Sequence, residues 1–223
     1  MKKQWNREAF INLFREHADE ENAGPMRAYM REQFPFLGIR SPLRRQLIRQ
    51  FLADYKLPGG EELLVEVDAV FNLPEREFQY AAMAMLEKQV KHLKTTDLVF
   101  CEKLITTKPW WDSIDTIAPR IVGAIVLRDR SAGELVMKQW NSSDDIWLNR
   151  SAILHQLKYK TEMNEKLLYD IIRKHTGSSE FFIQKAIGWV LREYAKTNPS
   201  SVLSFVEATD LKPLSRREAL KHL

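Results

Sequence analysis

The sequence predicts an all-α fold built from short helices with short connections. Apolar residues recur at helical spacing, whereas the strict alternation typical of strands is scarce. Glycine occurs only eight times in 223 residues. Helix starts are well marked: Ser41-Pro42 and Asn198-Pro199 each place an N-cap candidate before a proline at the first helical position. These signals predict about a dozen helices.

Related residues recur at an interval of 35 positions, which Asp115, Arg150 and Lys185 follow in turn. An aromatic residue followed four positions later by a small one recurs on a similar spacing, in Phe78/Ala82, Trp147/Ser151 and Phe182/Ala186. Repeats of about 34 to 40 residues are typical of stacked helix pairs. We therefore expect one domain over residues 1–223, a HEAT-like helical repeat solenoid (an α-α superhelix) with a concave basic groove. An irregular helical bundle is the alternative.

Composition favours a cytoplasmic protein. Apolar residues make up 44% of the chain and charged residues 29%, and no apolar run approaches the roughly 18 residues of a membrane span. The start of the sequence has no apolar segment of a secretory signal. The lone Cys101 excludes an internal disulfide and fits a reducing compartment.

Basic residues cluster although the net charge is only +4. Two groups stand out: Arg40, Arg44, Arg45 and Arg49, and later Arg150, Lys158 and Lys160. Local basic stripes on a nearly neutral protein favour a polyanionic partner. A solvated helix face is the simpler alternative for either group.

The common catalytic frameworks are missing from the sequence. It contains no HExxH, no paired-cysteine metal site, no glycine-rich phosphate loop and no GxSxG. We therefore expect neither a metal nor an organic cofactor. For His155 a helix-packing role is favoured over a place in the groove, and Cys101 is expected in the core.

The segment from Lys108 to Asp115 (KPWWDSID) combines two tryptophans with two acids. Asp112 follows Pro109 closely and is expected to stabilise the first turn of a helix. Asp115 lies among apolar residues, where a charge is costly without a partner or a purpose. A catalytic role is therefore favoured for Asp115, and a structural salt bridge to a neighbouring helix is the alternative.

One carboxylate between indoles is sufficient to hydrolyse a glycosidic bond whose leaving group is already cationic. Ordinary glycosidases use two carboxyl groups, one of them to protonate the leaving oxygen. An N3- or N7-alkylated purine is already cationic and departs neutral, so no general acid is required. A single anion can then stabilise the positive charge that develops on the sugar, and indole faces add to this effect. A nearby arginine could hold a backbone phosphate.

Several stretches of the sequence resemble the DNA alkylation repair glycosylases of the AlkD type, small bacterial proteins built from HEAT-like repeats. The matching stretches, in the family's order, are TTKPWWDSID (106–115), WLNRSA (147–152), FIQKAIGW (182–189) and LREYAK (191–196). The likeness runs from about Pro25 to the C-terminus. The resemblance implies excision of cationic N3- and N7-alkylpurines from double-stranded DNA.

The resemblance also implies site residues. Asp115 would be the catalytic carboxylate, and Trp111 and Trp189 would contact the deoxyribose of the lesion. Arg150 would hold the adjacent phosphate. Further DNA contacts would come from Tyr29, Ser41, Arg45 and Lys158, and repeat spacing adds Lys185 to the DNA-binding set.

The preferred function is thus a monofunctional alkylpurine DNA glycosylase that leaves an abasic site and works as a monomer on duplex DNA. It would need no membrane, no obligate protein partner and no cofactor, and it would not cleave the strand. A non-catalytic protein that binds damaged or branched DNA is the second hypothesis. A protein–protein scaffold, a common use of helical repeats, is the third.

Overall fold

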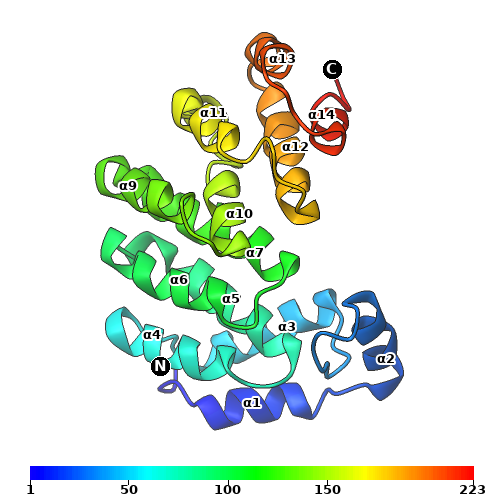
Figure 1. Cartoon of the computed structure of the whole chain (residues 1–223). Helices are drawn as coiled ribbons and strands as arrows, with labels where there is room; N and C mark the ends of the chain where they lie inside the picture. The colour runs from blue at the N-terminus through cyan, green and yellow to red at the C-terminus, as the bar shows by residue number, and fades with distance from the viewer. The chain divides into compact units, whose positions relative to one another are not determined.

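The structure, a computed structural model, describes residues 1–223, and its regular elements are helical (Figure 1). The one β-type contact is an isolated bridge between Lys3 and Tyr55. The predicted all-α class is confirmed. No helix is both long and apolar enough to cross a bilayer. Contacts divide the chain into two compact units, Met1–His92 and Leu93–Leu223, which are described separately. The single domain over 1–223 stays a prediction.

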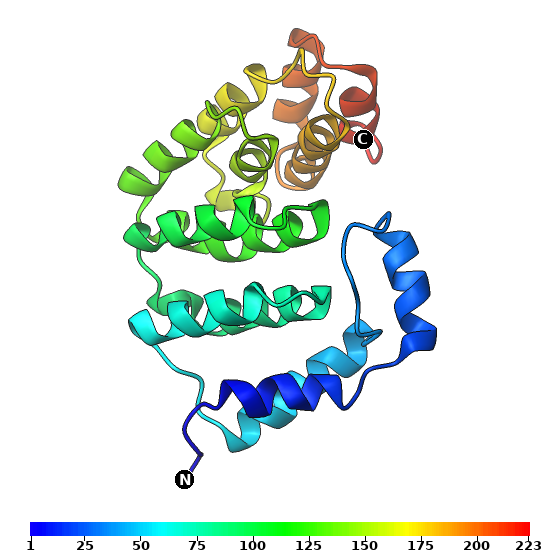
Figure 2. The same cartoon turned by 60° about the horizontal axis from the view of Figure 1, so that its bottom comes forward.

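The first unit contains the helices α1 to α5 and a short 3-10 turn. Rings from different helices fill its core: the Phe14 ring lies 4.9 Å from that of Phe10 and 5.5 Å from that of Phe78. Helices α4 and α5 pack along each other (Figure 2). The bounds are α1 Arg7–Arg15, α2 Glu20–Tyr29, α3 Ser41–Asp54, α4 Gly60–Phe71, α5 Arg76–Gln89 and η1 Val90–His92.

The second unit contains the remaining helices, with α12 packed against α10, α13 and α14. The stacked rings of Tyr169 and Phe205, 4.0 Å apart, tie α11 to α13. The bounds are η2 Thr95–Asp97, α6 Leu98–Thr106, α7 Trp111–Ile117, η3 Ala118–Val122, α8 Gly123–Arg128, α9 Arg130–Trp140, α10 Ile146–Leu154, η4 Lys160–Glu162, α11 Glu165–Arg173, α12 Phe181–Ala195, α13 Pro199–Ala208 and α14 Pro213–Ala219.

Helix starts follow the sequence signals with one correction. Asn198 caps α13, since its side chain accepts a hydrogen bond from the Ser201 amide and Pro199 is the first helical residue. The expectation that Ser41 caps a helix is wrong by one position. Helix α3 begins at Ser41, with Arg40 as its N-cap and without a side-chain cap. Proline tolerates either of the first two helical positions, because neither amide has a partner within the helix.

The interval of 35 residues also separates the first residues of five helices, each from the next. Helices α3, α5, α7, α10 and α12 begin at Ser41, Arg76, Trp111, Ile146 and Phe181. The fifth residues of these five helices are Arg45, Tyr80, Asp115, Arg150 and Lys185. The predicted helical repeat is therefore confirmed, and it places most of the expected polar site residues at one position of the repeat.

Candidate active site

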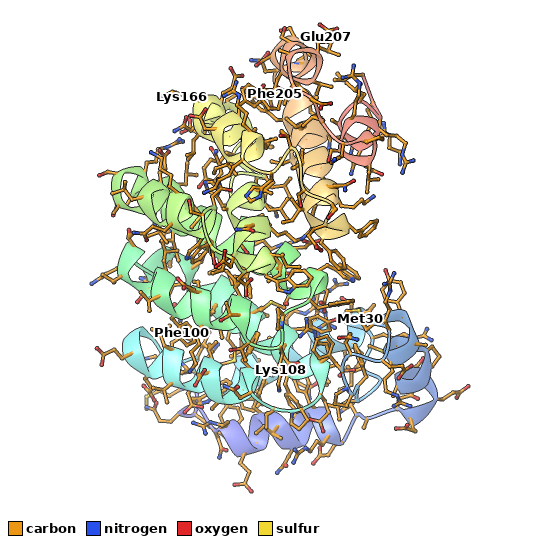
Figure 3. The ribbon with its side chains drawn as sticks, viewed as in Figure 1. Met30, Phe100, Lys108, Lys166, Phe205 and Glu207 are labelled. Atoms are coloured by element: carbon orange, nitrogen blue, oxygen red, sulfur yellow. The ribbon has the colours of Figure 1, made fainter.

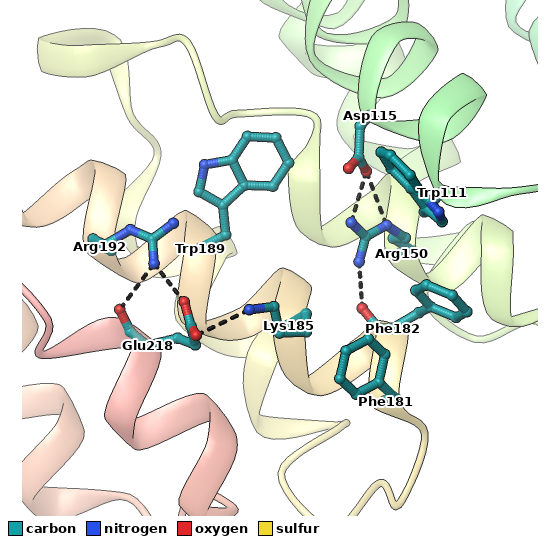
Figure 4. A pocket seen from close by; sticks show the side chains of 9 residues that line it. All are labelled: Trp111, Asp115, Arg150, Phe181, Phe182, Lys185, Trp189, Arg192 and Glu218. Atoms are coloured by element: carbon teal, nitrogen blue, oxygen red, sulfur yellow. Dashed lines mark hydrogen bonds and ion pairs between the residues drawn. The ribbon is translucent and has the colours of Figure 1, made fainter. Parts of the chain in front are cut away.

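A pocket in the second unit brings together the central residues that the sequence singles out (Figure 4). Helix α7 supplies Trp111 and Asp115, and α10 supplies Arg150. Helix α12 supplies most of the remaining wall, and α14 contributes a second carboxylate. The lining residues are Trp111, Asp115, Arg150, Phe181, Phe182, Lys185, Trp189, Arg192 and Glu218.

The tandem tryptophans have different surroundings because a helix starts between them. Trp110 is the N-cap of α7 and has an extended backbone. Its ring packs against Trp147 and Phe182, with centroids 5.9 Å and 5.3 Å away. Trp111 is the first helical residue and lines the pocket. One indole therefore anchors the start of α7, while the next is presented to the site.

The helix that carries Asp115 contains a wide turn. Segments α7, η3 and α8 run on without a break from Trp111 to Arg128, and η3 is a π-helical turn over Ala118–Val122. Pro119 lies in this turn and cannot donate to the carbonyl of Asp115, four residues earlier. Such π-helical turns occur frequently at functional sites.

Asp115 and Arg150 form a nearly buried ion pair, with side chains 20% and 4% exposed. Arg150 donates from Nε at 3.0 Å and from Nη2 at 2.7 Å, both to Oδ1 of Asp115. Its Nη1 donates to the Phe182 carbonyl. The other carboxylate oxygen, Oδ2, accepts no hydrogen bond from the chain, so Asp115 presents an uncommitted anionic oxygen beside the pocket.

Burial and charge act on Asp115 in opposite directions. Burial raises the pKa of its carboxyl above the ordinary value, and the charge and hydrogen bonds of Arg150 partly offset that rise. Repulsion from Asp112 adds a smaller upward contribution to this pKa. Arg150 thus stabilises the charged form of an acid that its surroundings would otherwise drive towards the neutral form.

The opposite wall of the pocket belongs to α12 and α14. Glu218 accepts a hydrogen bond from Lys185 Nζ at 2.9 Å and another from Arg192 Nη1 at 2.5 Å. These two contacts lower the pKa of Glu218 to about 2. Trp189 lies on α12 between the two cations in sequence (Figure 4).

Sequence reasoning missed Glu218, Arg192 and Phe181 as pocket residues. Phe181 is the first residue of α12, so the 35-residue spacing from Trp111 could have found it. Glu218 lies on α14, which starts at Pro213 and does not continue that spacing. The pairing of Glu218 with Lys185 and Arg192 depends on how α14 packs against α12, and no local sequence pattern signals that packing.

The outer predicted DNA contacts are exposed or partly exposed. In the first unit, Tyr29 is 73% exposed at the end of α2, and Arg45 Nη1 donates to Ser41 Oγ at 3.2 Å. In the second unit, Lys158 is exposed after α10. Their roles in binding DNA remain predictions.

Arg150 and Lys185 are bound to protein groups in this structure. Arg150 directs its hydrogen bonds to Asp115 and to the Phe182 carbonyl, and Lys185 pairs with Glu218. The phosphate contact expected of Arg150 and the DNA contact expected of Lys185 also remain predictions.

His155 lies outside the pocket and is buried at the end of α10. Its Nδ1 donates to the Ala152 carbonyl at 2.6 Å, while Nε2 is buried without a partner. Burial lowers its pKa to about 4, so the ring is neutral at neutral pH and packs as an apolar group. No group of three or more His, Cys, Asp or Glu side chains is placed to hold a metal ion.

Fold and site together define a helical-repeat protein with a pocket lined by aromatic and charged side chains. Residues 10–223 match the model of the DNA alkylation repair enzyme family, and the chain belongs to this family. A predicted DNA alkylation repair enzyme from Enterococcus faecalis has a similar solved structure, with a TM-score of 0.86 and 34% identity over 92% of this chain and 96% of that one.

A second solved structure, smu.31 from Streptococcus mutans UA159, shares the fold. Its TM-score is 0.63 at 15% identity, over 82% of this chain and 96% of that one. A search of curated proteins gave no match.

Proposed function

We propose that this protein is a DNA glycosylase for cationic alkylpurines. It would hydrolyse the N-glycosidic bond of N3- and N7-alkylated purines, such as 3-methyladenine and 7-methylguanine, in double-stranded DNA and leave an abasic site. The observation that carries the proposal is the state of Asp115: a nearly buried carboxylate with one oxygen bound by Arg150 and the other uncommitted beside the pocket.

The chemistry requires only this one anion. The bond between C1′ and the purine nitrogen breaks, and its electron pair neutralises the cationic base, so the leaving group needs no proton. Asp115 stabilises the positive charge that develops on the sugar, and the indole faces of Trp111 and Trp189 add a favourable cation–π interaction. A water molecule then adds to C1′, and its proton passes to Asp115 or to solvent.

The pair of Lys185 and Glu218 supports a monofunctional enzyme. Cleavage of the strand by a glycosylase uses an amine that attacks C1′ and forms an imine. Lys185 is the one lysine that lines the pocket, and its ammonium is bound to Glu218. We therefore expect an abasic product without strand cleavage.

Binding of the duplex would use the exposed groups of both units. Tyr29, Arg45 and Lys158 offer aromatic and cationic contacts for the backbone. We propose that the protein acts on DNA as a monomer, without a cofactor.

Release of free base from methylated duplex DNA tests this proposal. Wild type should release 7-methylguanine, and Asp115→Asn should reduce the rate at least about a hundredfold, because an amide cannot stabilise the developing cation. Asp144→Asn is the matched control: it makes the same change at an exposed aspartate between α9 and α10, outside the pocket lining, and should stay close to wild type. No release by wild type, or full activity of Asp115→Asn, would refute the mechanism.

The ion pair between Asp115 and Arg150 is also compatible with a second function, non-catalytic binding of damaged DNA. Asp115 and Arg150 also link α7 to α10, as they would in a non-catalytic protein that binds damaged DNA. That function predicts that Asp115→Asn lowers stability and that wild type binds duplex without releasing any base.

A further inference from the structure

Helix α14 brings a second carboxylate into the pocket through a close approach to α12. A Cβ atom added to Gly188 would lie 2.4 Å from Glu218 Cβ and 3.0 Å from the Ser215 carbonyl oxygen. Ser215 Oγ also donates to the Gln184 carbonyl at 3.0 Å. These contacts fix Glu218 against the face of α12 that lines the pocket.

Glu218 connects two cations that lie on one face of α12. Lys185 and Arg192 are seven residues apart, or about two helical turns, and each donates to one oxygen of Glu218 (Figure 4). The Glu218 side chain is 15% exposed, compared with 38% for Lys185. The carboxylate is thus the more enclosed partner, and the lysine is the more exposed one.

The charges around the pocket show what Glu218 contributes. Asp112 on α7 and Arg150 on α10 are the charged groups that act on Asp115. Lys185 and Arg192 from α12 and Glu218 from α14 line the same pocket. Arg150 occupies only Oδ1 of Asp115. Without Glu218, the pocket lining would hold three cations and one carboxylate, and Oδ2 of Asp115 would be the one carboxylate oxygen of that lining without a hydrogen bond.

We propose that Glu218 is a positioning residue: it holds Lys185 and Arg192 against α12 and so keeps Oδ2 of Asp115 available to the substrate. This inference rests on the proposed glycosylase function. When Glu218 is neutralised, the flexible Lys185 side chain loses its partner and competes with the developing sugar cation for Asp115.

A double-mutant cycle tests this role through single-turnover release of 7-methylguanine from methylated duplex. Glu218→Gln keeps the side-chain shape and should slow release by about tenfold, since one cation near a partly buried carboxylate is worth at least that factor. Combining it with Lys185→Gln should restore the rate to within about threefold of Lys185→Gln alone. Glu207→Gln, on the exposed face of α13 (Figure 3), is the matched control and should be close to wild type.

Two further measurements separate positioning from a merely structural role. In Glu218→Gln the acid limb of the rate–pH profile should move to lower pH, because an added cation favours ionised Asp115. Binding of undamaged duplex should stay as tight or become tighter, because one negative charge is lost. A structural defect would instead weaken binding and leave the acid limb in place.

The outcomes are distinct. If wild type releases no base, the proposed function fails and this inference fails with it. If wild type is active but Glu218→Gln is equally fast, or if Lys185→Gln does not relieve its defect, only the positioning role is refuted. If Glu218→Gln does not fold, the double variant Glu218→Gln/Lys185→Gln, which removes both partners of the ion pair, is compared with Lys185→Gln alone. A rate of base release far below that of Lys185→Gln refutes the positioning role.

Discussion

Arg150 satisfies only one of the two carboxylate oxygens of Asp115. Both hydrogen bonds, at 3.0 Å and 2.7 Å, end on Oδ1, and the third donor of the guanidinium binds the Phe182 carbonyl of α12. A single side chain thus links three helices and leaves one oxygen of the Asp115 carboxylate without a hydrogen bond.

Loss of Arg150 should reduce stability as well as activity. Arg150→Ala leaves Asp115 as an unpaired, nearly buried charge, and breaking such a pair typically costs about 3–5 kcal/mol. Arg150→Lys should be intermediate, because an ammonium cannot reproduce the paired hydrogen bonds of a guanidinium. Urea unfolding measures the first effect and base release the second. A stability of Arg150→Ala within 1 kcal/mol of wild type would show that the pair is not important for the fold.

The rate of base release should have an acid limb above the ordinary pKa of aspartate. Burial raises the pKa of Asp115, so protonation and loss of the reactive anion begin at a higher pH than for a solvated carboxyl. The rate should therefore rise with pH through this elevated pKa and then level off. Single-turnover rates in buffers of constant ionic strength measure it. An acid limb at or below the ordinary value, or one that persists in Asp115→Asn, would contradict the assignment.

Gly188→Ala should disturb the contact between α12 and α14. The added methyl group would meet Glu218 Cβ at 2.4 Å, and overpacking of this kind typically costs about 1–3 kcal/mol. Gly177→Ala is the control, because a Cβ there has nothing within 4 Å and should be neutral or slightly stabilising. Thermal unfolding compares the two variants. Equal melting temperatures would mean that α14 moves aside without cost.

His155 should make the protein less stable in mild acid. Its pKa is about 4 in the folded chain compared with 6.5 for the free side chain, so the unfolded state binds the extra proton between these values. The contribution is fully present above pH 6.5 and decreases as the pH falls towards 4, by about 3 kcal/mol in total. Urea unfolding from pH 7 to 4.5 should show a smaller loss for His155→Gln than for wild type. Parallel losses would exclude His155 as the cause.

Lys158 should contribute to the salt dependence of duplex binding. Each lysine that neutralises a phosphate adds about 0.9 to the slope of log K against log salt concentration. Lys158→Gln should therefore lower the slope by about one and weaken binding to damaged and undamaged duplex alike. Lys166→Gln, an exposed lysine on α11 (Figure 3), is the control. Equal slopes for the two variants would remove Lys158 from the interface.

The sequence predicts the repeat and its register well because both are local periodic features. The interval of 35 residues places Asp115 and Arg150 at equivalent positions, and the structure joins them. The hydrogen-bond partner of a cationic side chain, by contrast, is not a periodic feature of the sequence. The resemblance assigns Arg150 to a phosphate, whereas here it binds a carboxylate within the chain. Glu218 was missed because α14 leaves the repeat spacing and reaches Lys185 only through tertiary packing.

The wide turn at Pro119 also affects how relatives of this chain should be aligned. From Trp111 to Arg128 the helix contains a π-helical turn, which takes up one more residue than an ordinary turn. Residues on either side of it therefore do not share a single helical register. Deleting one residue here would restore a regular helix and leave Asp115 in about the same orientation relative to Ile125 and Val126, because an ordinary turn takes one residue fewer. A one-residue gap at Pro119 in a related sequence would therefore be compatible with an acid that still faces Arg150.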